Sequence, residues 1–131
     1  MMSRKQYKNA LACLVGLIII HIPAPLMAQK RFDGVWKVNF VVDNLPECGG
    51  PPFYRHKVRI NAGQISSDRE TSATGVLVGR VDNSGKVTVA GKNGKDRASG
   101  TGQFSSENSG GGKWQAITRK CNGQWIAEKI N

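Results

Sequence analysis

An alternation of side chains with a period of two residues is the strongest constraint on how this chain folds. Apolar side chains occupy every second position of 33–43 and again of 53–60. This pattern is typical of β-strands that bury one face. No segment after residue 28 shows the periodicity of an amphipathic helix of useful length. Turn signals recur at short intervals, among them Asn93-Gly94, and Asn-Gly favours tight hairpins because both residues tolerate positive φ.

The turn signals divide the chain into eight expected strands. Short hairpin links join antiparallel neighbours, so the sequence predicts an all-β antiparallel eight-stranded meander with one longer link from Asn44 to Pro52. Glycine-rich Ser109-Gly110-Gly111 is assigned to a turn, and 110–113 to a flexible hairpin without the spacing or helix of a phosphate loop. The expected strands are 33–43, 53–60, 64–68, 73–81, 86–91, 97–105, 112–120 and 124–130.

The first 28 residues have the pattern of a secretory signal peptide. Arg4, Lys5 and Lys8 precede an apolar run of thirteen residues from Ala10 to Ile22, and Leu26-Met27-Ala28 offers a small residue before a cleavage site. The run is shorter than the roughly 20 residues that span a bilayer. We therefore expect a signal peptide at 1–28 and an exported protein, periplasmic or secreted, with no transmembrane segment in the mature chain.

The mature chain, 29–131, has the length of one small domain. It keeps 16 of the 19 basic residues and all 9 acidic residues, which gives a net charge of +7. Its two cysteines, Cys48 and Cys121, suggest a disulfide in an exported protein.

This cysteine pair also predicts how the sheet closes. Successive links of a meander lie at alternating ends of the sheet, and Cys48 in the first link and Cys121 beside the seventh lie at the same end. In a flat sheet these links are six strands apart, around 28 Å at roughly 4.7 Å per strand. A disulfide needs Cα atoms within about 7 Å. The sheet must therefore curl into a closed or nearly closed barrel, which also removes exposed edges.

Each tryptophan follows a glycine two positions back. The pairs are Gly34 with Trp36, Gly112 with Trp114, and Gly123 with Trp125, and Gly102 with Phe104 repeats the spacing. Glycine permits sharp coiling, and an aromatic residue two positions on points to the same face and covers the space left bare. We interpret Trp36, Trp114 and Trp125 as structural aromatic residues, with contact to a ligand as the alternative.

Two segments carry a family resemblance. Phe32-Asp33-Gly34-Val35-Trp36 opens the mature domain, and Cys121-Asn122-Gly123-Gln124-Trp125-Ile126-Ala127-Glu128 closes it. The chain resembles small exported bacterial β-proteins of uncharacterised function that start F-D-G-x-W and end C-x-G-x-W-x-A-E, which implies export and a β fold. The early Gly-x-Trp is also similar to the first strand of lipocalins, of streptavidin and of barrel inhibitors of secreted proteases.

The sequence points to no catalytic centre. His56 is the only histidine after residue 28 and shares a strand face with Tyr54 and Val58. This position is typical of a hydrogen-bonded core histidine, with a catalytic base or a metal ligand as the alternative. No Cys and His spacing matches a zinc site. We expect no catalytic residue, no metal, no cofactor and no enzymatic activity.

Positive charge is the more informative feature. Arg55, Lys57 and Arg59 alternate with the apolar face of one strand and form a candidate binding face. Export makes nucleic acid an unexpected partner, so an acidic envelope polymer or an acidic protein is the expected one, with a solvated surface as the alternative. The oligomeric state is left open.

Three functions fit these observations. The first is a non-enzymatic binding module of the cell envelope or extracellular space, with a basic face for an acidic partner. The second is a small-ligand carrier that uses the barrel interior, which requires an empty lumen. The third is an inhibitor of a secreted hydrolase, for which the segment 48–52 is the candidate protruding loop.

Overall fold

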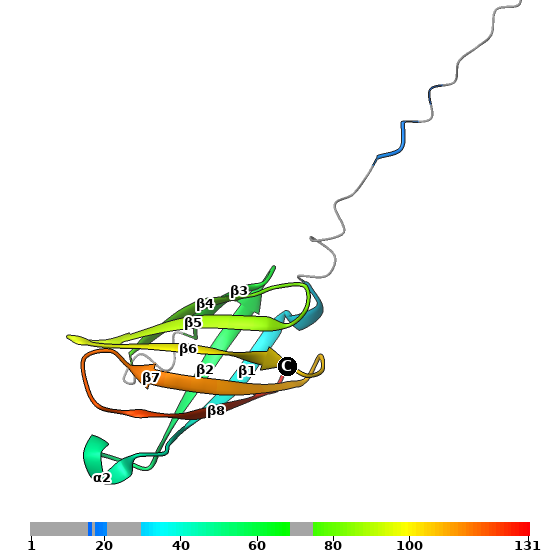
Figure 1. Cartoon of the computed structure of the whole chain (residues 1–131). Coiled ribbons are helices and arrows are strands. Elements are labelled where there is room, and N and C mark those ends of the chain that lie inside the picture. The colour runs from blue at the N-terminus through cyan, green and yellow to red at the C-terminus, as the bar shows by residue number, and fades with distance from the viewer. Residues whose placement is uncertain (1–15, 17, 21–29, 69–74) are drawn as a thin grey trace, which may run out of the picture.

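The computed structural model describes residues 16, 18–20, 30–68 and 75–131. In these residues eight antiparallel strands, each paired with the next along the chain, form a closed barrel because β1 also pairs with β8 (Figure 1). The predicted all-β meander and its closure are confirmed. The predicted signal peptide, 1–28, lies outside the described residues except for Gly16 and Ile18–Ile20.

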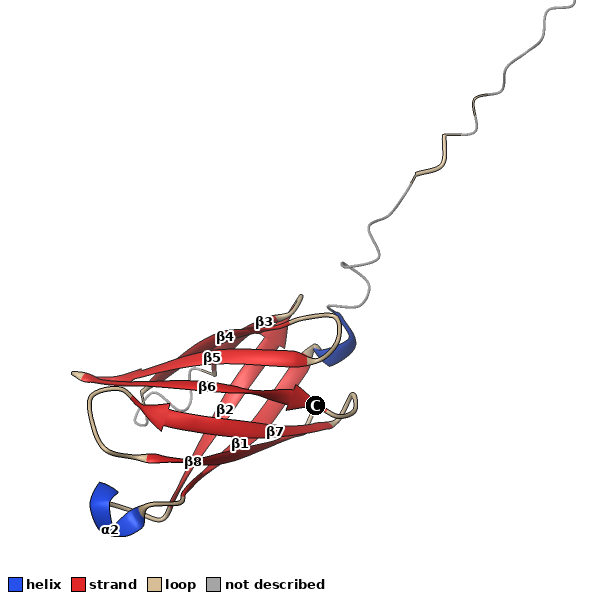
Figure 2. Ribbon diagram, viewed as in Figure 1, coloured by secondary structure: helices blue, strands red, loops and turns tan. Residues whose placement is uncertain are grey.

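The strands are separated by short connections, except between β1 and β2, and between β3 and β4, whose connection contains residues outside the described ranges. Besides the strands, the described chain contains the 3-10 helix η1 (Lys30–Phe32) and the four-residue helix α2 (Leu45–Cys48), which lie at opposite ends of the barrel (Figure 2). The strands are β1 (Gly34–Val42), β2 (Phe53–Asn61), β3 (Gln64–Ser67), β4 (Val76–Val81), β5 (Lys86–Asn93), β6 (Asp96–Phe104), β7 (Ser109–Ala116) and β8 (Asn122–Lys129).

Strand β7 is the main error of the prediction. The expected turn at 109–111 and hairpin at 110–113 are strand, while the expected strand residues 117–120 form the loop before β8. The reason is close packing: a Cβ at Gly110 would clash with the Phe104 ring, and one at Gly112 would clash with the Thr101 carbonyl of β6. The glycines therefore let two strands and an aromatic ring approach, which is a role that a turn signal does not reveal.

The cysteine pair joins the two ends of the closed sheet. Cys48 and Cys121 form a disulfide with their Cα atoms 4.7 Å apart, linking α2 to the loop between β7 and β8. Both lie at the end of the barrel where β1 ends and β8 begins. The prediction that the two cysteines lie at the same end of the sheet is confirmed, and so is their predicted pairing.

The opposite end of the barrel, which we call the closed end, is filled by aromatic side chains. Phe32 of η1 caps it, and the Trp36 indole N–H donates to the Phe32 carbonyl at 2.8 Å. Phe104 stacks on Trp36 with 4.4 Å between ring centroids and meets Trp125 edge-on at 6.4 Å. Packing at this end leaves residual space of only about 20 Å³ between the side chains.

The glycines and aromatic residues complement one another across strands rather than along them. The Trp125 ring lies where a Cβ at Gly102 would be, and the Trp114 indole nitrogen would lie 2.9 Å from a Cβ at Gly123, its cross-strand partner. The sequence predicts the covering ring on the same strand as the glycine, whereas the rings nearest to Gly102 and Gly123 come from other strands. Aromatic rings reach sideways over the neighbouring strand because the tilted strands bring glycine of one strand beside the ring of the next.

Candidate ligand-binding site

A cavity of about 300 Å³ occupies the disulfide-bearing end of the barrel, which we call the mouth. This volume is at the lower limit of the range for small-molecule sites. The cavity and the packed closed end divide the lumen into a hollow half and a filled half. The residues that line the cavity include Phe40, Tyr54, His56, Leu77, Val89, Gly91, Ala98, Gly100, Trp114, Ala116 and Cys121.

Small side chains account for the empty space. Gly91 on β5, Ala98 on β6 and Ala116 on β7 take inward positions near the mouth. A Cβ at Gly91 would make only ordinary contacts, 3.7 Å from Leu77 and 3.9 Å from Ala98. These contacts leave room for a side chain at Gly91, in contrast to Gly102, where the Trp125 ring takes the place of a Cβ. The hollow half is thus encoded by small inward residues on three adjacent strands.

Aromatic side chains form the opposite wall. Phe40 of β1 meets Trp114 of β7 edge-on, with 6.2 Å between ring centroids. The Trp114 indole N–H donates to the Val41 carbonyl at 3.0 Å, which fixes the ring at the cavity edge. Trp114 therefore packs against the core and also lines the cavity, whereas Trp36 and Trp125 lie in the packed core.

His56 supplies a polar group to the same cavity. It is 6% exposed, and its Nε2 lies 2.7 Å from the Ser67 hydroxyl oxygen. That oxygen accepts the Leu77 N–H at 2.6 Å, so Ser67 links β3 to β4 beyond their last backbone pair. Burial lowers the pKa of His56 from its ordinary value. The predicted core position of His56 is confirmed, and its imidazole also faces the hollow half.

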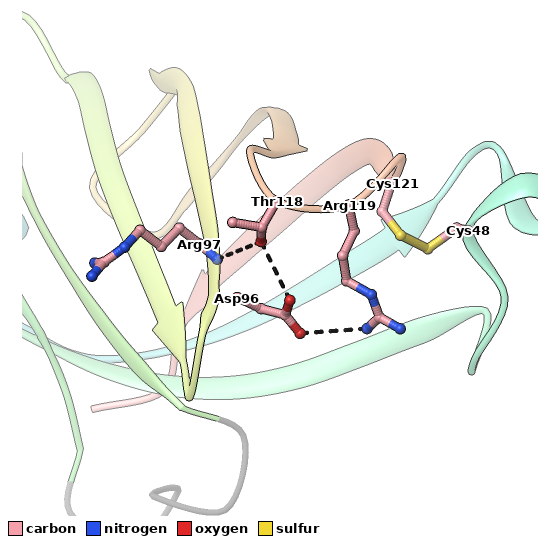
Figure 3. A network of polar contacts seen from close by, with 6 residues as sticks. All are labelled: Cys48, Asp96, Arg97, Thr118, Arg119 and Cys121. Atoms are coloured by element: carbon pink, nitrogen blue, oxygen red, sulfur yellow. Dashed lines mark hydrogen bonds and ion pairs between the residues drawn. A yellow bond between two sulfur atoms is a disulfide. The ribbon is translucent and has the colours of Figure 1, made fainter.

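A network of polar contacts holds the loop 117–121 at the mouth (Figure 3). Thr118 Oγ1 accepts the Arg97 N–H at 3.0 Å and donates to Asp96, while the Arg119 guanidinium lies 3.6 Å from Asp96. On its other side the loop is tied by the disulfide and by the Asn44 side chain, which donates to the Lys120 carbonyl at 2.7 Å. The mouth is therefore anchored on two sides.

Positive charge surrounds the mouth. Among the described residues, four cations and one carboxylate, that of Asp96, line the cavity, and Asp96 is paired with Arg119. The charge imbalance favours an anionic group at this position. The four cationic residues are Arg55, Lys92, Arg97 and Arg119.

The predicted binding face lies on the outer surface of β2. Arg55 and Arg59 are exposed, and the Arg55 guanidinium lies over the Phe53 ring at 5.4 Å. Lys57 lies between them in a half-buried position and faces Lys37 of β1. Arg55 and Arg59 have no carboxylate within ion-pair distance in the part of the chain that the structure describes.

The segment 48–52, the candidate inhibitory loop, follows α2 and is tethered at Cys48 by the disulfide. Within the described ranges, no three His, Cys, Asp or Glu side chains gather closely enough to hold a metal ion. Likewise, the residues described form no helix with the length and hydropathy needed to cross a membrane.

Comparisons with known proteins yield no relative. The chain matches no protein-family model, no curated protein and no solved structure.

Proposed function

We propose that this protein is an exported, non-enzymatic binding protein that holds a small amphipathic acid in the hollow half of its barrel. The observation that supports this proposal is the division of the lumen, with a cavity of about 300 Å³ above a packed aromatic core. An empty cavity lowers the stability of a folded protein, because the side chains around it lose packing contacts. The hollow half is therefore not explained by the stability of the barrel.

The chemistry of the walls defines the ligand class. Phe40, Leu77 and Val89 offer apolar contact deep in the cavity, and the cations near the mouth favour an anionic group there. A ligand with an apolar or aromatic body and one acidic group would contact both the apolar wall and the cations at the mouth. His56 and Tyr54 provide further polar atoms for orientation.

Filling the cavity tests this proposal. Gly91→Leu places a side chain into the hollow half, and Ala90→Leu adds one to the outer surface at the preceding position of β5. The probe is 1-anilinonaphthalene-8-sulfonate, followed by fluorescence and displaced by decanoate. We expect the native chain and Ala90→Leu to bind both probes, and Gly91→Leu to bind at least tenfold more weakly while melting at no lower temperature. Equal binding by the two leucine variants, or no binding by the native chain, would reject the proposal.

A basic outer wall favours a second candidate function, docking of an acidic partner. At outward positions of the described strands the only carboxylate is Glu128, whereas cations occupy β1, β2, β4, β5, β6 and β7. The outward cations are Lys37, Arg55, Lys57, Arg59, Arg80, Lys86, Lys92, Arg97 and Lys113.

The row on β2 is the place to test this second function. Replacing Arg55, Lys57 and Arg59 by serine removes three positive charges from one strand. We expect alginate, as a model acidic polymer, to bind the native chain in a salt-sensitive way, with weakening above roughly 0.15 M salt. The triple variant is expected to lose this binding with its fold intact. Unchanged affinity would mean that the row is only a solvated surface.

A further inference from the structure

A transverse row of four exposed side chains crosses the outside of the mouth. Val76 of β4 faces Lys92 of β5, and Lys92 faces Arg97 of β6. Ile117 follows directly, because its N–H donates to the Arg97 carbonyl at 2.7 Å. Val76 and Ile117 are 55% and 66% exposed. We call these four residues the rim row.

The two central residues of the rim row break a rule of strand pairing. Like charges directly opposite each other destabilise a sheet. Lys92 and Arg97 are such a pair, and Lys95 at the tip of the same hairpin adds a third positive charge. None of the three has a carboxylate within ion-pair distance among the described residues. Figure 3 shows Arg97 directed away from Asp96, whose carboxylate is engaged by Arg119 and Thr118.

The two outer residues of the rim row give it an amphipathic character. Large apolar side chains exposed on each side of two unpaired cations offer both apolar insertion and charge attraction. An acidic polymer or a polar protein surface uses the cations but gains little from Val76 and Ile117. An anionic lipid surface uses both, because apolar side chains enter the interface while Lys and Arg contact the headgroups.

We infer that the rim row docks the mouth of the barrel on an anionic lipid surface. Val76, Lys92 and Arg97 also line the cavity, so docking places the cavity beside the lipid. This inference deepens the proposed function, since an amphipathic acid partitions into lipid and would exchange with the cavity at this surface. The docking itself depends only on the exterior of the barrel.

Vesicle sedimentation tests the inference with matched variants. The probes are vesicles of phosphatidylcholine alone and vesicles containing phosphatidylglycerol. Lys92→Ser/Arg97→Ser removes two charges at the mouth, and Arg80→Ser/Lys86→Ser removes two exposed charges from the closed-end half of β4 and β5. We expect the native chain to bind the anionic vesicles, and the mouth variant to bind about thirty-fold more weakly, from the contribution of two cations near an anionic surface. The closed-end variant, Arg80→Ser/Lys86→Ser, should lose clearly less of its affinity for the anionic vesicles.

Replacing exposed apolar residues by serine distinguishes binding to a lipid surface from binding to other polyanions. Val76→Ser/Ile117→Ser is expected to weaken vesicle binding about tenfold, whereas Val78→Ser/Ile130→Ser, at similarly exposed positions away from the mouth, should change it little. Equal losses in both charge variants, or no effect of Val76→Ser/Ile117→Ser, would overturn the inference in favour of a general polyanion surface. Absence of binding to anionic vesicles would overturn it outright.

The cavity-filled variant distinguishes this inference from the proposed function. Gly91→Leu should bind vesicles like the native chain, because its new side chain is inside the barrel. Loss of vesicle binding in that variant would contradict docking through the exterior, whatever the result of the ligand titration.

Discussion

Trp114 and Gly123 face each other on β7 and β8, and the Trp114 indole crosses the space above Gly123 to donate to the Val41 carbonyl of β1 at 3.0 Å. Three strands thus meet at one glycine. It lies at the pairing of β1 with β8 that closes the barrel, which we call the seam. A Cβ at Gly123 would clash with that carbonyl and lie 2.9 Å from the indole nitrogen. The pair shows why the smallest and the largest residues occur together in this chain.

Substitution of this glycine should be costly. We expect Gly123→Ala to lower the free energy of unfolding by about 2–4 kcal/mol, because it overpacks the seam and breaks a hydrogen bond. Gly91→Ala is the matched control, since its Cβ has room, and should be neutral or stabilising by up to about 1 kcal/mol. Urea unfolding of both variants measures the difference. Similar stabilities for the two would disprove the close packing at Gly123.

The disulfide should support the barrel without being required for its topology. Its loop spans 73 positions, and on the chain-entropy model reduction lowers the free energy of unfolding by roughly 4 kcal/mol. The β1–β8 ladder remains to close the sheet. We expect Cys48→Ser/Cys121→Ser to keep its far-ultraviolet circular dichroism spectrum and to unfold at a lower urea concentration. Free thiols in native material, found by mass mapping, would contradict the pairing.

Stability should depend on pH through His56. Burial lowers its pKa below the ordinary value of 6.5, so the unfolded chain takes up a proton at a higher pH than the folded chain does. The corresponding stability is complete above pH 6.5 and is lost as the pH falls towards the lowered pKa. Asp82 also has a lowered pKa, first through its hydrogen bond from Ser84, but its effect begins only below 3.8.

A glutamine variant isolates the histidine contribution. Between pH 7.5 and 5.5 we expect the unfolding free energy of the native chain to fall more steeply than that of His56→Gln. Chemical denaturation at several pH values gives both slopes. Parallel curves would show that His56 titrates alike in the folded and unfolded chains.

The proposed export of this protein predicts a processed N-terminus. The mature protein should begin at or near Gln29, after the apolar run and the small residue at Ala28. N-terminal sequencing of protein recovered outside the cytoplasm measures this directly. A membrane-bound form that retains residues 1–28 would refute the assignment.

The fold was largely predictable because local patterns and one long-range covalent constraint agree. Alternation gave the strands, and the pairing of Cys48 with Cys121 required closure. Strand β7 was missed because Gly110 and Gly112 have the composition of a turn, and only the Phe104 ring and the β6 backbone beside them explain a strand there.

The candidate site was less predictable than the fold. The sequence does not indicate that Gly91, Ala98 and Ala116 line a cavity, because small residues at inward strand positions occur in filled and in hollow barrels alike. Which of the two occurs depends on whether a large side chain reaches over them from the next strand. Trp125 does so at Gly102, and no such ring covers Gly91.

Nuclear magnetic resonance mapping tests the hollow half most directly. Decanoate is titrated into the labelled protein while backbone amide signals are followed. We expect the largest shifts at Tyr54, Gly91 and Ala98 around the cavity, and little change at Ile60 and Val87 in the closed end. Shifts confined to the outer wall, or no saturable shifts, would contradict a ligand site inside this barrel.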